Sequence, residues 1–140
     1  MREPRPDETP GEAAARAAAE ERARRIEVEF LEGVRARLPD HPAVVESLGC
    51  LYTEMGRYQD GLNADRQMVQ MDPGSPTAWY NLACSLALTG QPDDAFAALE
   101  KAVALGYDDA EWMQADDDFA PLKQDPRFAR ILAQLLARKA

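Results

Sequence analysis

Histidine and cysteine are scarce in this 140-residue chain, which has one histidine and two cysteines. Enzyme active sites need a nucleophile, a base and an orienting group, or a metal site. Without another histidine or a cysteine pair nearby, His41 is a poor metal ligand, and it lies between Asp40 and Pro42 in a helix-breaking segment. We therefore expect no catalytic residue, no metal and no cofactor, and predict that the protein is not an enzyme.

Long apolar runs are also missing. No segment approaches the roughly 18 apolar residues of a transmembrane span. Residues 1–10 hold three prolines and lack the apolar stretch of a signal peptide. They are predicted to form a disordered tail. The two cysteines have no metal-type spacing, which is typical of free thiols in a reducing compartment. The expected location is the cytoplasm.

Positive charge is in deficit, because 16 Lys and Arg face 25 Asp and Glu, for a net charge of -9. Phosphates of nucleic acids and of anionic membrane surfaces would be repelled, so neither is an expected partner. A basic protein surface is compatible with this charge. Arginine outnumbers lysine and alanine is abundant, which is typical of a GC-rich coding sequence and favours a bacterial origin.

What the chain does contain is a repeat. Equivalent residues recur 34 positions apart, in the pairs Pro39/Pro73, Pro42/Pro76, Leu48/Leu82, Cys50/Cys84 and Gly56/Gly90. A period of this size indicates stacked supersecondary units. Apolar residues at helical spacing, interrupted by these glycines and prolines, predict two pairs of helices over 42–55 and 58–71, then 76–89 and 91–105. The predicted fold is all-α, a superhelix of αα-hairpins.

The segment before the repeats, residues 11–38, contains no proline and is rich in Ala, Glu and Arg. It is predicted to be a degenerate repeat or one long helix. Its expected apolar stripe comprises Ile26, Phe30, Val34 and Leu38, with Val28 and Leu31 beside them.

The repeats resemble the tetratricopeptide repeat family. The residues that carry the resemblance are Trp79, Leu82, Ala83, Leu86, Gly90, Ala95, Leu99 and Ala102. It implies repeats over 42–75 and 76–109, with Trp79 as a core anchor between them. The first repeat departs from the family pattern, because Gly61 replaces an alanine and Asp65 replaces a large apolar residue.

The C-terminal segment, residues 110–140, resembles the closing cap of bacterial tetratricopeptide arrays, which would complete one domain over residues 11–140. The last helix is expected after Asp125, with an apolar stripe of Phe128, Ile131, Leu132, Leu135 and Leu136. The acidic run over 108–118 is interpreted as a solvated turn in which Asp118 caps the turn at Phe119. The alternative is a docking patch for a basic partner.

The resemblance implies that the first helix of each pair lines a concave groove. Its predicted partner-binding residues are Glu46, Ser47, Cys50, Thr53, Glu54, Thr77, Tyr80, Asn81 and Cys84. The resemblance also implies that Asn81 bonds to the backbone of an extended peptide, since an amide both donates and accepts. A ring and a hydroxyl make Tyr80 a typical interface anchor. Cys50 and Cys84 could bridge only if both side chains leaned inward; otherwise they are groove-lining thiols.

The predicted function is non-catalytic protein–protein binding, by an adaptor, scaffold or assembly factor. Some members of the family clamp a terminal carboxylate with basic residues. Here Glu46 and Glu54 occupy the groove wall without Lys or Arg, so a neutral or basic peptide or protein segment is the expected ligand. The alternative is a structural protein whose repeats mediate homo-oligomerisation, through the Ala-rich first helix or the cap.

Overall fold

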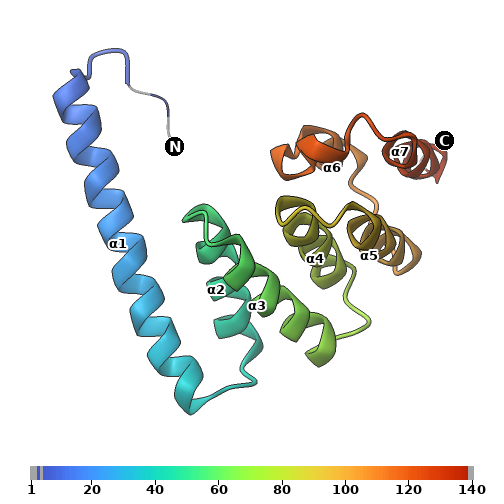
Figure 1. The fold of residues 1–140 in the computed structure, drawn as a ribbon, viewed down its shortest axis with the longest axis horizontal. Coiled ribbons are helices and arrows are strands. Elements are labelled where there is room, and N and C mark those ends of the chain that lie inside the picture. Colours follow the sequence, from blue (N-terminus) through green and yellow to red (C-terminus); the bar gives the residue numbers. More distant parts are fainter. Residues whose placement is uncertain (1–2, 4, 139–140) are drawn as a thin grey trace.

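The computed structural model describes residues 3 and 5–138 of the chain (Figure 1). In this part the chain forms helices and no strand. Their bounds are α1 Pro10–Arg37, α2 Pro42–Glu54, α3 Tyr58–Met71, α4 Pro76–Leu88, α5 Pro92–Ala104, α6 Ala110–Ala115, the 3-10 helix η1 Asp117–Leu122 and α7 Pro126–Arg138. The predicted fold class, an all-α array of helical hairpins, is confirmed.

Prolines and glycines set the helix boundaries. A proline begins five of the α-helices in this part of the chain, where its missing N–H costs no helical hydrogen bond. Gly56 and Gly90 follow α2 and α4 with φ of 75° and 72°. Only glycine adopts this left-handed backbone without a steric penalty, so both hairpins can turn tightly.

The two hairpins, α2/α3 and α4/α5, stack side by side, with α3 packed against α4 (Figure 1). The larger core surrounds α4 and α5 and contains Phe96, Leu99, Met113, Phe119 and Leu135. Trp79 is only partly buried: its ring packs against this core and its Nε1 donates to the carbonyl of Pro73 at 2.8 Å. Trp79 therefore packs at the edge of the junction between the two hairpins and is not the central core anchor that was predicted.

The departures from the family pattern in α3 have a steric reason. A Cβ on Gly61 would lie 2.9 Å from Thr53 Oγ1, and a Cβ on Gly49 would lie 3.0 Å from Asp65 Oδ1. Real Cβ atoms rarely approach so closely, so the two glycines let α2 and α3 come together around the Asp65 carboxylate. Leu62 fills the remaining space and is fully buried.

Helix α1 is one continuous helix of 28 residues that contacts the body through its C-terminal half. The expected stripe is wrong in part: Val28 is buried and Leu31 and Val34 pack beside it, but Ile26, Phe30 and Leu38 are exposed. The reason is that α1 packs mainly on one neighbouring helix, α2, which covers only one narrow face.

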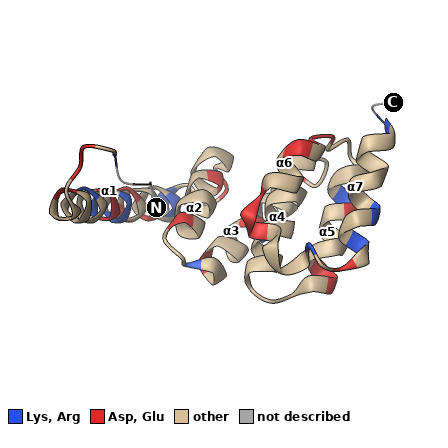
Figure 2. Cartoon of the chain, turned by 90° about the horizontal axis from the view of Figure 1, so that it is seen from above, with Lys and Arg blue, Asp and Glu red and all other residues tan. Residues whose placement is uncertain are grey.

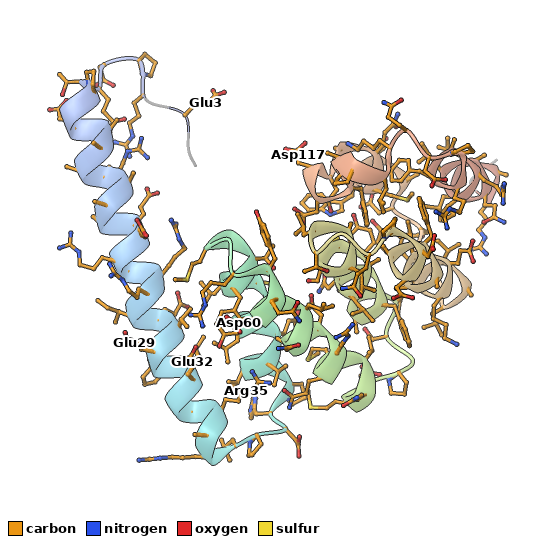
Figure 3. All side chains as sticks on the ribbon, viewed as in Figure 1. Glu3, Glu29, Glu32, Arg35, Asp60 and Asp117 are labelled. Carbon is orange, nitrogen blue, oxygen red and sulfur yellow. The ribbon has the colours of Figure 1, made fainter. Side chains whose placement is uncertain are left out.

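Polar contacts also hold α1 against the first hairpin, on the face that contains the buried Val28. Tyr52 donates to Glu32 Oε1 at 2.6 Å, and the Arg35 guanidinium donates to Gln67. In Figure 3 the labelled Glu32 and Arg35 lie on the side of α1 that faces α2 and α3. Burial and the Glu32 hydrogen bond raise the pKa of Tyr52 to about 12, so this phenol stays a donor at neutral pH.

The start of α1 lies inside the segment expected to be disordered. Thr9 and Glu12 form a reciprocal capping box, which supplies acceptors for the first free N–H groups of the helix. Glu8 pairs with Arg16 at 2.8 Å, and this hydrogen bond lowers the pKa of Glu8 to about 2. The rest of that expectation includes residues 1, 2 and 4, which lie outside the described residues.

Helices α6, η1 and α7 close the open end of the second hairpin (Figure 1). Asp116, and not Asp118 as expected, caps η1 by accepting from the backbone N–H of Asp118 at 3.0 Å. On α7 the residues Phe128, Ile131 and Leu135 are buried, whereas Leu136 is 54% exposed, contrary to the predicted stripe. None of the described helices is long and apolar enough to cross a membrane.

Candidate functional site

A cavity of about 320 Å³ lies where α2, α3 and α4 meet the α6–η1 segment. It brings together six of the nine residues predicted to bind a partner: Cys50, Thr53, Glu54, Tyr80, Asn81 and Cys84. The other three, Glu46, Ser47 and Thr77, do not line it. These three lie nearer the N-terminal ends of α2 and α4, whereas the cavity faces the later turns of both helices.

Tyr80 lines the cavity but is largely buried, and its role as an interface anchor stays a prediction. It is 5% exposed, and its hydroxyl donates to Asp116 Oδ2 at 2.7 Å. Its ring stacks on Tyr107 at 4.4 Å and meets the edge of Phe119 at 5.4 Å. The α6–η1 segment folds over α4 and turns this residue into a wall of the cavity.

Asn81 has the surroundings expected of a ligand-binding amide. It is partly exposed and lines the cavity, and its side chain has no hydrogen-bond partner among the described residues. Its donor and its acceptor are therefore both available to a partner. Its binding role stays a prediction.

Six further residues line the cavity that the sequence did not assign to the site: Gly49, Asp65, Ser85, Trp112, Asp116 and Asp118. Asp65 and Ser85 form a buried pair in which Ser85 donates to Asp65 Oδ2 at 2.5 Å. A signal was present, because Asp65 and Asp116 stand at repeat positions where the family has large apolar residues. A carboxylate at such a position indicates a polar site built into the packing.

Comparison with known proteins identifies the repeats. Residues 52–115 match the family model described as tetratricopeptide repeat. Residues 52–115 carry tetratricopeptide repeats. This agrees with the alternation of α2/α3 and α4/α5, which the match spans from the end of α2 to the end of α6.

Three proteins are similar to this chain. A chloroplastic protein of Arabidopsis thaliana is 27% identical over 89 residues, which are 61% of this chain and 27% of that protein. The chain thus spans about a quarter of that relative. The structure titled MamA MSR-1 C2 superimposes with a TM-score of 0.62 at 21% identity, covering 84% of this chain and 70% of the other.

The third is the type III secretion translocator chaperone SycD of Yersinia enterocolitica, in a structure described as an alternative dimer. It gives a TM-score of 0.55 at 16% identity and covers 91% of this chain and 89% of that chain. At these identities the two solved structures show only the fold of the chain.

Carboxylates are the charged side chains of this cavity. Glu54, Asp65, Asp116 and Asp118 line it, and no Lys, Arg or His of the described residues does. Burial raises the pKa of Asp118, and the neighbouring charges of Asp116 and Asp117 raise it further. Figure 2 shows the same asymmetry at larger scale, with acidic residues on α6 and basic residues on α7. The cavity therefore favours cationic ligands.

One group in the cavity has the composition of a metal site. Cys84 Sγ and one carboxylate oxygen each from Asp116 and Asp118 lie within 4.8 Å of one another. Burial raises the pKa of the Cys84 thiol far above its ordinary value, so it is protonated at neutral pH and donates toward Asp116 at 3.7 Å. A metal would have to displace this proton before the thiol could bind it. Cys50 and Cys84 both line the cavity as free thiols.

Asp65 should make folding pH-dependent. Burial raises its pKa from 3.8 to about 6, opposed only by the hydrogen bond from Ser85. The folded state then binds more protons than the unfolded state between these values, so stability falls as pH rises from about 4 to about 6. We expect a loss of about 3 kcal/mol over this window. Urea unfolding measured at several pH values should show this fall in stability for the wild type and not for Asp65→Asn. If the stability of both proteins fell equally with pH, Asp65 would not be its source.

Proposed function

We propose that the protein is a non-catalytic protein–protein interaction module, an adaptor or scaffold or an assembly factor, that binds a neutral or basic segment in the groove between α2 and α4. The observation that carries the proposal is the free amide of Asn81 beside a cavity lined by four carboxylates. An extended chain presents N–H and C=O groups that one amide can satisfy together. The tetratricopeptide fold supports the general class of function.

The charge of the cavity favours the class of ligand. Glu54, Asp65, Asp116 and Asp118 repel a phosphate or a terminal carboxylate, and the chain as a whole carries -9. Nucleic acid, anionic membrane and acidic peptides are therefore poor partners. A basic segment would be attracted, most strongly at low ionic strength.

The chemistry of the described residues also favours binding over catalysis. His41 occupies the N-cap position of α2, where its side chain makes no capping hydrogen bond, and it does not line the cavity. The buried Cys84 thiol is held in its protonated and unreactive form. The cytoplasmic location stays a prediction.

Asn81→Ala should weaken partner binding without unfolding the chain. A peptide displayed in a random library and selected on the whole protein would serve as the probe, with affinity measured by calorimetry. Loss of one hydrogen bond should cost about 1 kcal/mol, or about fivefold in Kd. Asn63→Ala, at an exposed residue of α3 that does not line the cavity, is the matched control and should leave the affinity unchanged. Equal affinity of all three proteins would place the peptide outside the groove.

A second candidate is a structural protein that self-associates through α1. It is favoured by Ile26 and Phe30, which lie one turn apart on α1 and are 61% and 69% exposed. Large apolar side chains gathered on one exposed helix face often mark an interface. Light scattering at several concentrations should then show a mass that rises for the wild type and stays monomeric for Phe30→Glu. A monomer at every concentration would exclude this candidate.

A further inference from the structure

We propose that the cavity receives an arginine side chain of the partner segment, with its guanidinium between Glu54, Asp118 and the ring of Trp112. This inference rests on the proposed function, because it requires a partner segment in the groove. It adds the residue type that the partner must present.

The cavity holds negative charge that the described chain leaves uncompensated. All ion pairs of the described residues lie elsewhere, and their acids are Glu8, Glu20, Glu32, Asp60, Asp93 and Asp125. The carboxylates of Glu54 and Asp118 accept no hydrogen bond from described residues, although Asp118 is half-buried. Glu54 is exposed, whereas the half-buried carboxylate of Asp118 has limited access to water and is costly unless a cation pairs with it.

Asp65 provides a second and independent indication. Its side chain is only 7% exposed, and its Oδ2 accepts from Ser85. Its Oδ1 has no hydrogen-bond donor among the described residues, and the residue lines the cavity. This oxygen is therefore open, on the cavity side, to a donor supplied from outside the chain.

The aromatic wall of the cavity is Trp112 on α6. Its indole is 63% exposed, and the residue also lines a smaller adjoining cavity. The backbone N–H of Trp112 donates to Asp109 Oδ1 at 3.0 Å, which caps the start of α6 beside the cavity. A large exposed indole beside carboxylates is a strong site for a cation, because the ring face attracts positive charge.

The chain itself builds this arrangement twice with its own arginines. Arg57 lies 4.6 Å above the ring of Tyr52 and pairs with Glu32 and Asp60. In the second case, Arg127 lies 4.3 Å above the ring of Phe96 and pairs with Asp93 and Asp125. The cavity offers an indole and several carboxylates, but no arginine of the described chain.

Arginine fits this set better than lysine. A planar guanidinium can stack on a ring and at the same time direct its five N–H groups toward more than one carboxylate, whereas an ammonium is a compact and strongly hydrated point charge. A cavity of about 320 Å³ is large enough for a guanidinium and the end of its aliphatic chain. The remaining groove, including Asn81, is then left for the backbone of the partner.

The test uses the two tryptophans as reporters. The chain has two indole N–H groups, and Trp112→Phe assigns their NMR signals by removing one of them. Nα-acetyl-arginine methylamide at low salt should shift the Trp112 signal. The Trp79 signal should not shift, because this indole N–H is hydrogen-bonded to the carbonyl of Pro73 and Trp79 does not line the cavity. The citrulline analogue has a similar shape without the charge and should shift neither, and the lysine analogue should bind more weakly than the arginine one.

A pair of neighbouring substitutions makes the test specific. Asp118→Asn should raise the midpoint of the arginine titration about tenfold, because a charge-assisted contact is lost. Asp117→Asn removes the same charge from an exposed residue that does not line this cavity, and it should have little effect. Figure 3 shows Asp117 at the edge of the α6–η1 segment. Asp118→Asn should also retain the thermal stability of the wild type, since it relieves repulsion with Asp116.

Three results would overturn the inference. They are an unchanged Trp112 signal with the arginine derivative, an equal response to the citrulline analogue, or binding of calcium or zinc at this signal while arginine has no effect. The peptides selected in the Asn81 experiment distinguish failure of the arginine pocket from failure of the proposed function. If they bind in the groove without containing arginine, the function stands and the arginine pocket is wrong.

Discussion

Phe119→Ala is expected to lower the free energy of unfolding by about 3–5 kcal/mol, the range for removing a fully buried phenyl ring. Phe119 is fully buried in η1 and meets Tyr80 edge-on at 5.4 Å and Phe128 at 6.0 Å. Its ring joins α4, the α6–η1 segment and α7. The loss approaches the entire stability of many small domains, so a large drop in the thermal midpoint should follow.

Phe30→Ala is the matched control, since it removes the same ring from a side chain that is 69% exposed on α1. It should change stability by no more than about 0.5 kcal/mol. Both variants are compared by circular dichroism at a concentration where light scattering reports one species. If Phe119→Ala melted like the wild type, the α6–η1 segment would not be packed on α4, and the cavity would lose the wall that contains Asp116 and Asp118.

The 34-residue period was sufficient to predict the hairpins. Proline before each pair and glycine between its helices act through local backbone preferences, which do not depend on tertiary contacts. The predicted helices over 76–89 and 91–105 accordingly agree closely with α4 and α5, Pro76–Leu88 and Pro92–Ala104. No end differs by more than one residue.

The buried face of α1 could not be predicted by the same means. Ile26 and Phe30 follow an i, i+4 spacing as regular as the spacing of the residues that are buried. Which side docks depends on the neighbour, and the face with Val28 also carries Glu32, which accepts from Tyr52 across the interface. Apolar periodicity alone gives no weight to such a polar contact.

The site was predictable on its α2 and α4 walls and not on its third wall. The family resemblance placed Cys50, Asn81 and Cys84 in the groove. The return of the chain over α4 depends on Asp116, which accepts from Tyr80 36 residues away. A hydrogen bond between residues so far apart in sequence leaves no periodic signal. The acidic run was therefore interpreted as a solvated turn, although two of its members line the cavity.

Ile131→Asp should abolish the cooperative fold of the C-terminal half. Ile131 is 2% exposed on α7, where it packs in the core that also holds Phe96 and Phe128. A carboxylate there would lose its water and gain no cationic partner in this apolar core, which costs several kcal/mol. We expect a loss of about 4 kcal/mol or more, together with exposure of the apolar residues of α5. We expect light scattering to show aggregation and circular dichroism to show no cooperative melting transition.

Leu136→Asp provides the control, because it places the same charge on the same helix five residues away. Leu136 is 54% exposed, so its substitution leaves the core intact and should alter stability by about 0.5 kcal/mol or less. The comparison cancels the change in net charge, and it leaves burial as the main difference between the two variants. If both proteins remained soluble and melted together, α7 would not close the array. The residues of α5 would then need another cover, and the expectation that residues 110–140 act as a cap would have to be abandoned.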